Sequence, residues 1–378
     1  MADRVYLDWN ATTPLRPEAK AAMAHAWDVA GNPSSVHAEG REARRLVEDA
    51  RAVVAAAVGA EARNVVFTSG GTEANSLALA PGITRGKAPA AERLLVSAIE
   101  HVSVLSGGRF TADAIRSIRV TREGIVDLAH LGALLDGPPA LVSIMLANNE
   151  TGAIQPVAEA AKLVHAAGGL LHVDAIQALG KIAFDLVSTG ADLLSLSAHK
   201  IGGPKGIGAL VLADGVEGLA PLLSGGGQEK GRRAGTENVA AIAGFGAATK
   251  AALAGREHEA SRVEALRDRV EIGLRQTPEI VIFADSVQRL PNTVLFAAPG
   301  MRAETAVIGF DLAGIAVSSG SACSSGKVQP SHVLRAMGYN EKIAQAAVRL
   351  SLGWSTSEAD IDCCLQGWRK LSGTLLKA

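Results

Sequence analysis

The stretch Ser195-Leu196-Ser197-Ala198-His199-Lys200 is followed directly by Ile201-Gly202-Gly203-Pro204-Lys205-Gly206-Ile207-Gly208. A mostly apolar run over 193–196 ends in small and polar residues, and a second apolar run begins at Ile207. This pattern predicts two strands joined by a glycine-rich turn, with Lys200 at the junction. Desolvation at such a junction would lower the pKa of the lysine and free its amine for Schiff-base chemistry. The alternative for this stretch alone is an exposed turn lysine beside a hairpin.

The composition is that of a globular protein, with 48% hydrophobic and 20% charged residues in a chain of 378. A net charge of -1 gives no electrostatic reason to expect binding to nucleic acid or to an anionic membrane. No apolar run reaches the roughly 18 residues that a membrane span needs. The amino terminus lacks a basic segment followed by an apolar core, and cysteines are scarce. We therefore expect a soluble, cytoplasmic protein.

Apolar runs alternate with helical patterns over the first two thirds of the chain. Strands are expected at 65–67, 94–96, 118–120, 141–146, 170–173 and 193–196. Helices are expected at 17–30, 38–58, from 73 onward and at 157–167. Continuous apolar strands separated by helices are typical of an α/β protein whose mainly parallel sheet is covered on both faces.

The last third has a different pattern. An alanine-rich helix is expected from about 237 to 254 and a charged helix from 257 to 276. Short strands at 280–283, 293–296, 316–318 and 348–351, mixed with helices, indicate a smaller α+β domain. With the extended amino-terminal arm added, the sequence predicts a large domain at 15–258 and a small domain formed by 1–14 and 259–378.

Polar side chains follow the carboxyl ends of several expected strands: His101, Asn148, Asn149, Asp174, Ser197, His199 and Lys200. Parallel strands would bring these side chains to one edge of the sheet, where open α/β sheets bind ligands. The turn at 69–72, between a strand and a helix, offers backbone N–H groups to a phosphate. The alternative there is an ordinary turn in which Thr72 caps the helix.

This set of groups suits pyridoxal 5'-phosphate (PLP), which needs a lysine, an acid near the pyridine nitrogen, an anion site for the phosphate and a group against the ring. Seven motifs, spread in order over nearly the whole chain, then resemble those of the NifS/IscS-type (group I) cysteine desulfurases of the class V aminotransferase family. They are Ser-Gly-Gly-Thr-Glu-Ala-Asn (69–75), Glu-His (100–101), Asn-Asn-Glu-Thr-Gly (148–152), Val-Asp-Ala-Ile-Gln (173–177), Ser-Ala-His-Lys (197–200), Arg-Ala-Gly-Thr-Glu-Asn (233–238) and Ser-Ser-Gly-Ser-Ala-Cys (318–323).

The resemblance implies the aminotransferase-like fold (fold type I of PLP enzymes) and a homodimer with its active site at the subunit interface. It implies that Lys200 forms the Schiff base with the cofactor and then moves the Cα proton of the substrate. It also implies that Asp174 pairs with the pyridine nitrogen, and that His101 stacks on the ring and acts as acid or base. Gln177 would contact the phenolic oxygen.

The remaining roles implied by the resemblance concern the phosphate and the substrate. The phosphate-binding residues would be Gly71, Thr72, Ser197, His199 and, from the other subunit, Thr236. Asn149 would contact both cofactor and substrate, and Arg349 would clamp the substrate carboxylate as a bidentate guanidinium can. The alternative for Arg349 is a surface ion pair.

Cys323 lies in a run of serines and glycines, where a thiol has the exposure that a nucleophile needs. The resemblance implies that Cys323 takes sulfur from L-cysteine as a persulfide, leaving L-alanine, and passes the sulfur to an iron–sulfur scaffold protein or another acceptor. A selenocysteine lyase, an aminotransferase of the same fold and a catalytically silent iron–sulfur assembly scaffold remain alternatives.

Two features depart from this picture or stand outside it. Trp354 occupies a position where the family often carries an arginine. Cys363 and Cys364 are adjacent, with no histidine or further cysteine at metal-ligand spacing, so they are expected to be core or boundary residues and no metal site is expected.

Overall fold

The computed structural model describes residues 4–86, 89–320 and 330–375. Its central sheet has seven strands in the order β2-β9-β8-β7-β6-β4-β5. The strands are β2 (Val65–Thr68), β4 (Arg93–Ser97), β5 (Ile115–Ile118), β6 (Ala140–Met145), β7 (Leu170–Asp174), β8 (Leu193–Ser197) and β9 (Gly208–Leu212). Strands from β8 to β5 are parallel, and β9 runs antiparallel to both β8 and β2. The mainly parallel sheet is confirmed, but the strand expected at 118–120 was wrong, because β5 ends at Ile118.

Helices cover both faces of this sheet. Successive residues of a strand alternate between two hydrophobic clusters, as Val65 and Val66 do on β2. One cluster joins the sheet to α2 (Ala38–Ala57), α5 (Leu128–Leu134), α6 (Val157–Ala166) and the first half of α8. The other joins it to α3 (Gly71–Ala78) and α4 (Val102–Leu105). Helices α1 (Pro17–Trp27), which packs on α8, and α7 (Leu186–Thr189) add Ala19 and Leu186 to the first of these clusters.

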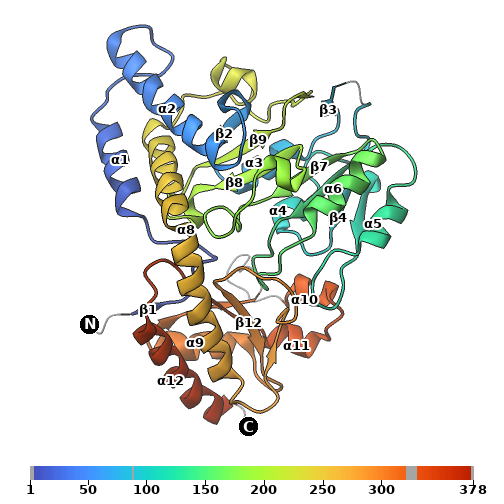
Figure 1. The fold of residues 1–378 in the computed structure, drawn as a ribbon, viewed down its shortest axis with the longest axis vertical. Coiled ribbons are helices and arrows are strands. Elements are labelled where there is room, and N and C mark those ends of the chain that lie inside the picture. The colour runs from blue at the N-terminus through green and yellow to red at the C-terminus, as the bar shows by residue number, and fades with distance from the viewer. Residues whose placement is uncertain (1–3, 87–88, 321–329, 376–378) are drawn as a thin grey trace.

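One helix, α8 (Val239–Leu274), replaces the two helices expected in this region. The gap expected between residues 254 and 257 does not occur, because the one glycine there, Gly255, costs a helix only about 1 kcal/mol relative to alanine. Phe245, in the first half, packs in the cluster of the seven-stranded sheet, whereas Val270, in the second half, packs in a separate cluster. Figure 1 shows α8 passing from beside α1 and α2 into the lower part of the molecule, where it lies near α9 and α12.

The separate cluster that contains Val270 surrounds a four-stranded sheet in the order β11-β12-β15-β14. Its strands are β11 (Val281–Ile282), β12 (Thr293–Ala297), β14 (Ser318–Ser319) and β15 (Val348–Ser351). The helices around it are α9 (Ala303–Leu312), α10 (His332–Ala336), α11 (Glu341–Ala346) and α12 (Glu358–Leu375). The amino-terminal arm joins this part, because β1 (Val5–Tyr6) pairs in parallel with β13 (Ile315–Ala316).

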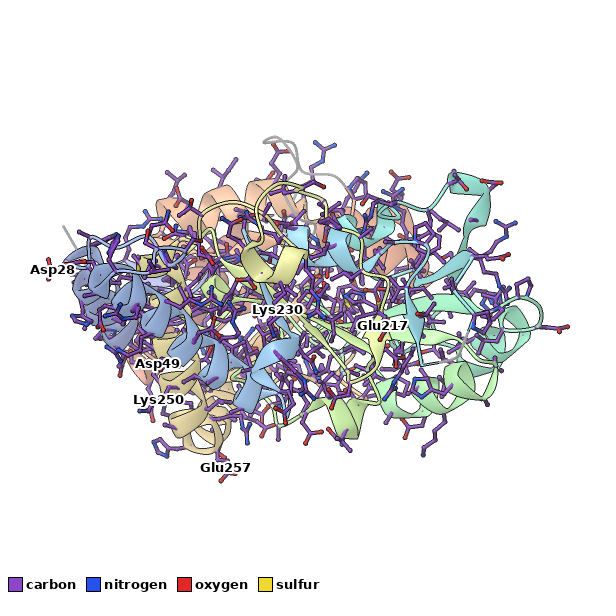
Figure 2. All side chains as sticks on the ribbon, turned by 90° about the horizontal axis from the view of Figure 1, so that it is seen from above. Asp28, Asp49, Glu217, Lys230, Lys250 and Glu257 are labelled. Carbon is purple, nitrogen blue, oxygen red and sulfur yellow. The ribbon has the colours of Figure 1, made fainter. Side chains whose placement is uncertain are left out.

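Two short strands, β3 (Thr84–Arg85) and β10 (Val216–Glu217), pair at the periphery. Exposed charged side chains lie on the outer helices, as Asp49 on α2 and Lys250 and Glu257 on α8 do in Figure 2. Within the described ranges, the helices are all too short or too polar to cross a bilayer.

Candidate active site

A cavity of about 450 Å³ opens at the carboxyl ends of the parallel strands. Ten residues expected at the site line it: Gly71, Thr72, His101, Asn149, Asp174, Gln177, Ser197, His199, Lys200 and Arg349. The expected convergence of strand-end side chains is therefore confirmed except for Asn148, which does not line the cavity and is buried with its amide donating to the backbone oxygen of Ile99. Thr236 lies elsewhere in the same chain, in a hollow that it shares with Ser69 and Glu237. Cys323 lies outside the described residues, although Ser318, five positions earlier in the sequence, lines the cavity.

Lys200 ends a single 3-10 turn, Ala198–Lys200, that follows β8 directly. Its Nζ donates hydrogen bonds to the backbone oxygens of Asn10, at 2.6 Å, and Ala11, at 2.9 Å. Burial and the charge of Arg349 lower the pKa of Lys200 to about 8, against the opposing effect of two carboxylates. At pH 7 roughly a tenth of its amine is therefore neutral and nucleophilic, far more than for an ordinary lysine.

Asp174 ends β7, and its buried carboxylate points into the same cavity. Asn75 Nδ2 donates to Oδ2 at 2.8 Å, and the backbone N–H of Ile176 donates to Oδ1 at 3.0 Å. Burial raises the pKa of Asp174, and the hydrogen bonds from Asn75 and Ile176 oppose that rise. A cationic N–H placed against this carboxylate would relieve the cost of its burial. Asn75 has no role among the predicted site residues, although it lies within the 69–75 motif.

His101 caps the amino terminus of α4 and lines the cavity. The backbone N–H of Ser103 donates to its Nδ1 at 3.2 Å, so the neutral ring carries its proton on Nε2. Burial lowers the pKa of His101, while the charge of Asp174 opposes this effect. A neutral, flat imidazole suits contact with an aromatic ring better than an imidazolium would, because burying a charge is costly.

Four of the lining residues, Gly71, Thr72, Ser197 and His199, have the features of an anion site. Helix α3 begins at Gly71, and the first N–H groups of a helix have no acceptors within it. Ser197 Oγ is buried without a hydrogen-bond partner among the described residues. A Cβ added to Gly71 would lie 2.2 Å from Ile176 Cδ1, so only glycine fits there without displacing its neighbour. His199 is kept neutral, because burial and Lys200 lower its pKa to about 4.

These observations test whether the cavity fits PLP. Four groups line the one cavity: a lysine that is partly neutral, a buried carboxylate, a flat neutral ring, and an anion site with an unpartnered hydroxyl. Each matches one requirement of the cofactor. The residues present therefore fit PLP.

Sequence reasoning missed Asp8 and Asn10 of the amino-terminal arm, which line the cavity, and Lys181, which contacts the cavity residues Gln177 and Asn10. Lys181 Nζ donates to Gln177 Oε1 at 2.7 Å and to Asn10 Oδ1 at 3.1 Å. Gln177 Nε2 in turn donates to the backbone oxygen of Asn10 at 2.9 Å. Lys181 follows Gln177 by four positions, the spacing of neighbours on one helical turn, and that spacing was the available signal.

Arg349 projects from β15 and is almost fully buried. Its guanidinium donates to the backbone oxygen of Asn149 at 2.9 Å and to the Asp8 carboxylate at 2.8 Å. The alternative of a surface ion pair is therefore wrong. The pairing with Asp8 was not predicted.

Comparisons with known proteins agree with this geometry. The model of the family described as aminotransferase class-V matches residues 5–363. The cysteine desulfurase of Cereibacter sphaeroides is 45% identical over 370 residues, which cover 96% of this chain and 94% of that protein.

Two solved structures extend the comparison. A NifS-like protein from Rickettsia africae ESF-5 is 36% identical, with a TM-score of 0.88 over 98% of this chain and 100% of that one. A structure described as SspA in complex with cysteine is 30% identical, with a TM-score of 0.77 over 92% of this chain and 98% of that one. The likeness to NifS-type cysteine desulfurases and the fold of type I PLP enzymes are thus confirmed. The chain belongs to the class-V aminotransferase family.

Proposed function

We propose that this protein is a PLP-dependent cysteine desulfurase, which converts L-cysteine to L-alanine and transfers the sulfur through Cys323. The observation that carries the proposal is the meeting of Lys200, Asp174 and Arg349 in one cavity. An amine, an acid and a carboxylate-binding guanidinium are what PLP chemistry on a free amino acid requires. Similarity to proteins named cysteine desulfurase, and to a protein solved with cysteine, supports this choice of substrate.

The residues that would hold the cofactor follow from the site. Lys200 would bind its carbonyl carbon, Asp174 its pyridine nitrogen and His101 one face of its ring. Gly71, Thr72, Ser197 and His199 would bind its phosphate. When bound, PLP supplies an electron sink that stabilises negative charge on the substrate carbons.

Proton transfer falls to Lys200. Because its pKa is about 8, the amine exchanges a proton readily at neutral pH, as a group that must both accept and return one should. Asn10 and Ala11 hold that amine through neutral carbonyl oxygens, which do not fix its charge. Arg349 and Asn149 would orient the substrate by its carboxylate.

In the sulfur-transfer step, the Cys323 thiolate attacks the sulfur of L-cysteine. An S–S bond forms, the C–S bond breaks, and its electron pair stays with the substrate carbon, which is then protonated to give L-alanine. The enzyme retains a persulfide on Cys323. An iron–sulfur scaffold or another thiol-bearing acceptor would remove that sulfur.

The quaternary structure and the domain division are part of the proposal. A homodimer would let the partner subunit's Thr236 reach the phosphate, which agrees with the position of Thr236 outside the cavity of its own chain. The division into 15–258 and 1–14 with 259–378 accords with the two hydrophobic clusters and with the pairing of β1 and β13. The cytoplasmic location stays a prediction from the sequence.

The alternatives make different products. An aminotransferase would convert an amino acid to a keto acid, a silent scaffold would release neither alanine nor sulfide, and a selenocysteine lyase would prefer selenocysteine. The retained Lys200, Asp174 and His101 favour an active enzyme over a scaffold.

The test is turnover of L-cysteine by purified protein with PLP and a reductant, expected to give alanine and sulfide in equal amounts. Lys200→Ala should abolish turnover. Cys323→Ala should release little alanine, whereas the matched control Cys363→Ala, at an exposed position on α12, should be unaffected. Mass spectrometry after brief exposure to cysteine should find the added sulfur on the Cys323 peptide. An added sulfur on Cys363 or Cys364, or normal turnover by Cys323→Ala, would refute the proposed mechanism.

A further inference from the structure

The guanidinium of Arg349 is already occupied by a carboxylate of its own chain. Nη2 donates to Asp8 Oδ1 at 2.8 Å, and Nη1 donates to the backbone oxygen of Asn149 at 2.9 Å. Nε is buried and has no hydrogen-bond partner among the described residues. Asp8 and Arg349 both line the cavity that contains Lys200. A carboxylate thus sits where the proposed function places the carboxylate of the substrate.

The backbone around Asp8 is fixed. The arm lies between β15 and β13, because the N–H of Ser351 on β15 donates to the oxygen of Leu7 at 2.8 Å and the N–H of Leu7 donates to the oxygen of Ala316 on β13 at 2.8 Å. Asp8 forms a bridge with Ser351, two positions after Arg349. The arm therefore keeps the Asp8 carboxylate within reach of the guanidinium.

The side chain of Asp8 is held far less firmly. Among the described residues, its only hydrogen-bond donor is Arg349, and 22% of the side chain is exposed, against 6% for Arg349. Arg349 is the anchored member of the pair, through Asn149 and its burial. Asp8 is the member that can turn away.

A bidentate carboxylate on Arg349 must use Nη2, because that atom belongs to both edges of the guanidinium fork. Nη2 carries two N–H groups, one on each edge, so a bound substrate would either displace Asp8 from the N–H that it accepts or lie directly beside Asp8. If Asp8 stayed in place instead, its negative charge would lie beside the incoming carboxylate and repel it.

We propose that Asp8 is a specificity-determining residue that acts as an internal stand-in for the substrate carboxylate. It accepts a hydrogen bond from the Arg349 guanidinium in the free enzyme, and it weakens the binding of every ligand that carries an α-carboxylate. L-Alanine carries the same carboxylate as L-cysteine, so Asp8 also promotes release of the product. This inference rests on the proposed function only in taking Arg349 as the carboxylate site.

The first test uses the cofactor-free protein and needs no turnover. Calorimetry with 3-mercaptopropionate, which is cysteine without its amine, should give a dissociation constant roughly three- to tenfold lower for Asp8→Asn than for the wild type. Asp8→Glu, which restores the charge, should stay near the wild type. The matched control is Asp311→Asn, which removes the ion pair that Asp311 makes with Arg4 on the same arm and should change nothing.

The second test uses the PLP-loaded enzyme. Asp8→Asn should lower the KM for L-cysteine and the inhibition constant of L-alanine by a similar factor. The constants for cysteinamide, which lacks the carboxylate, should change much less. The KM for cysteinamide also reports any effect of Asp8 on the chemistry of Lys200. The ratio of the KM for L-cysteine to the KM for cysteinamide therefore isolates the effect of Asp8 on carboxylate binding.

Three outcomes would overturn the proposal. The first is that Asp8→Asn binds 3-mercaptopropionate no more tightly than the wild type does. The second is that Asp8→Asn leaves the ratio of the KM for L-cysteine to the KM for cysteinamide unchanged. The third is an Asp8→Asn chain that does not fold. If the protein proved unable to release alanine from cysteine, the proposed function would fail, while the calorimetry would still decide the role of Asp8.

Discussion

The Nζ of Lys200 lies 2.6 Å from the backbone oxygen of Asn10, which also accepts a hydrogen bond from Gln177 Nε2 at 2.9 Å. One carbonyl of the amino-terminal arm thereby holds two side chains that come from the large sheet. Five further hydrogen bonds fix Asn10: its N–H donates to Ser351, its Nδ2 donates to Thr293 and Asn149, and its Oδ1 accepts from Asn292 and Lys181. The position of the Lys200 amine thus depends on both parts of the molecule.

The amine of Lys200 should be unusually reactive near neutral pH. Because its pKa is lowered to about 8, its neutral fraction at pH 7 is more than about a hundredfold that of an ordinary lysine. The neutral amine is the nucleophile, so its labelling should rise with pH and reach half its maximum near pH 8. Competitive acetylation of the cofactor-free protein, followed by mass spectrometry of the Lys200 peptide, measures this, with exposed Lys162 as an internal reference.

The same measurement has a built-in control. The charge of Asp8 raises the pKa of Lys200, so Asp8→Asn should move the midpoint to lower pH. A midpoint well above pH 9 in the wild type, or a shift to higher pH in Asp8→Asn, would contradict this account of the site.

Lys181→Met should destabilise the protein and loosen Gln177. The substitution keeps the length of the side chain but leaves Gln177 Oε1 without its donor, whereas Asn10 Oδ1 still accepts from Asn292. An unsatisfied buried polar group costs about 1–3 kcal/mol, so the free energy of unfolding in urea should fall by roughly that amount. Lys205→Met, on an exposed part of the neighbouring turn, is the matched control and should change it by less than about 0.5 kcal/mol. Equal effects of the two substitutions would rule out the proposed network.

The site residues that the seven-stranded sheet supplies could be predicted well from the sequence. His101, Asp174 and Lys200 follow apolar runs that form parallel strands, and the geometry of a parallel sheet brings such positions together whatever the loops do. The site residues that the amino-terminal arm supplies were not predictable in the same way. Asp8 and Asn10 reach the cavity because β1 pairs with β13, more than 300 positions away, and neither strand is longer than two residues. Such short strands leave almost no periodicity to read.

Trp354 illustrates a second limit. Its ring lies edge-on to Trp9, with centroids 5.7 Å apart, and the guanidinium of Arg16 lies 5.4 Å from its centroid. Arg16 also pairs with Glu259 at 3.0 Å. The tryptophan therefore joins the arm, the start of α1 and α8. A single sequence cannot reveal contacts of this kind, because the partners are distant in the chain and share no pattern.

Glu150→Gln should change how stability depends on pH. Glu150 is buried and accepts a hydrogen bond from Ser331 Oγ at 2.5 Å. Burial raises its pKa to about 7, although Ser331 and Arg349 oppose the rise. A carboxyl group whose pKa is raised by folding adds stability at pH values below its unfolded pKa of 4.5, and that contribution is lost as pH rises through about 7. The wild type should therefore lose stability between pH 4.5 and pH 7 on account of this group.

Glutamine keeps the shape of Glu150 and an oxygen that can accept from Ser331, but it does not ionise. The free energy of unfolding in urea should match the wild type near pH 4.5 and exceed it by up to about 3 kcal/mol at pH 8. Glu304→Gln, at an exposed position on α9, serves as the control and should show no such growth with pH. If the difference between Glu150→Gln and the wild type stayed constant from pH 4.5 to pH 8, Glu150 would not be protonated in the folded protein. Its burial would then have to be compensated by contacts other than those with Ser331 and Arg349.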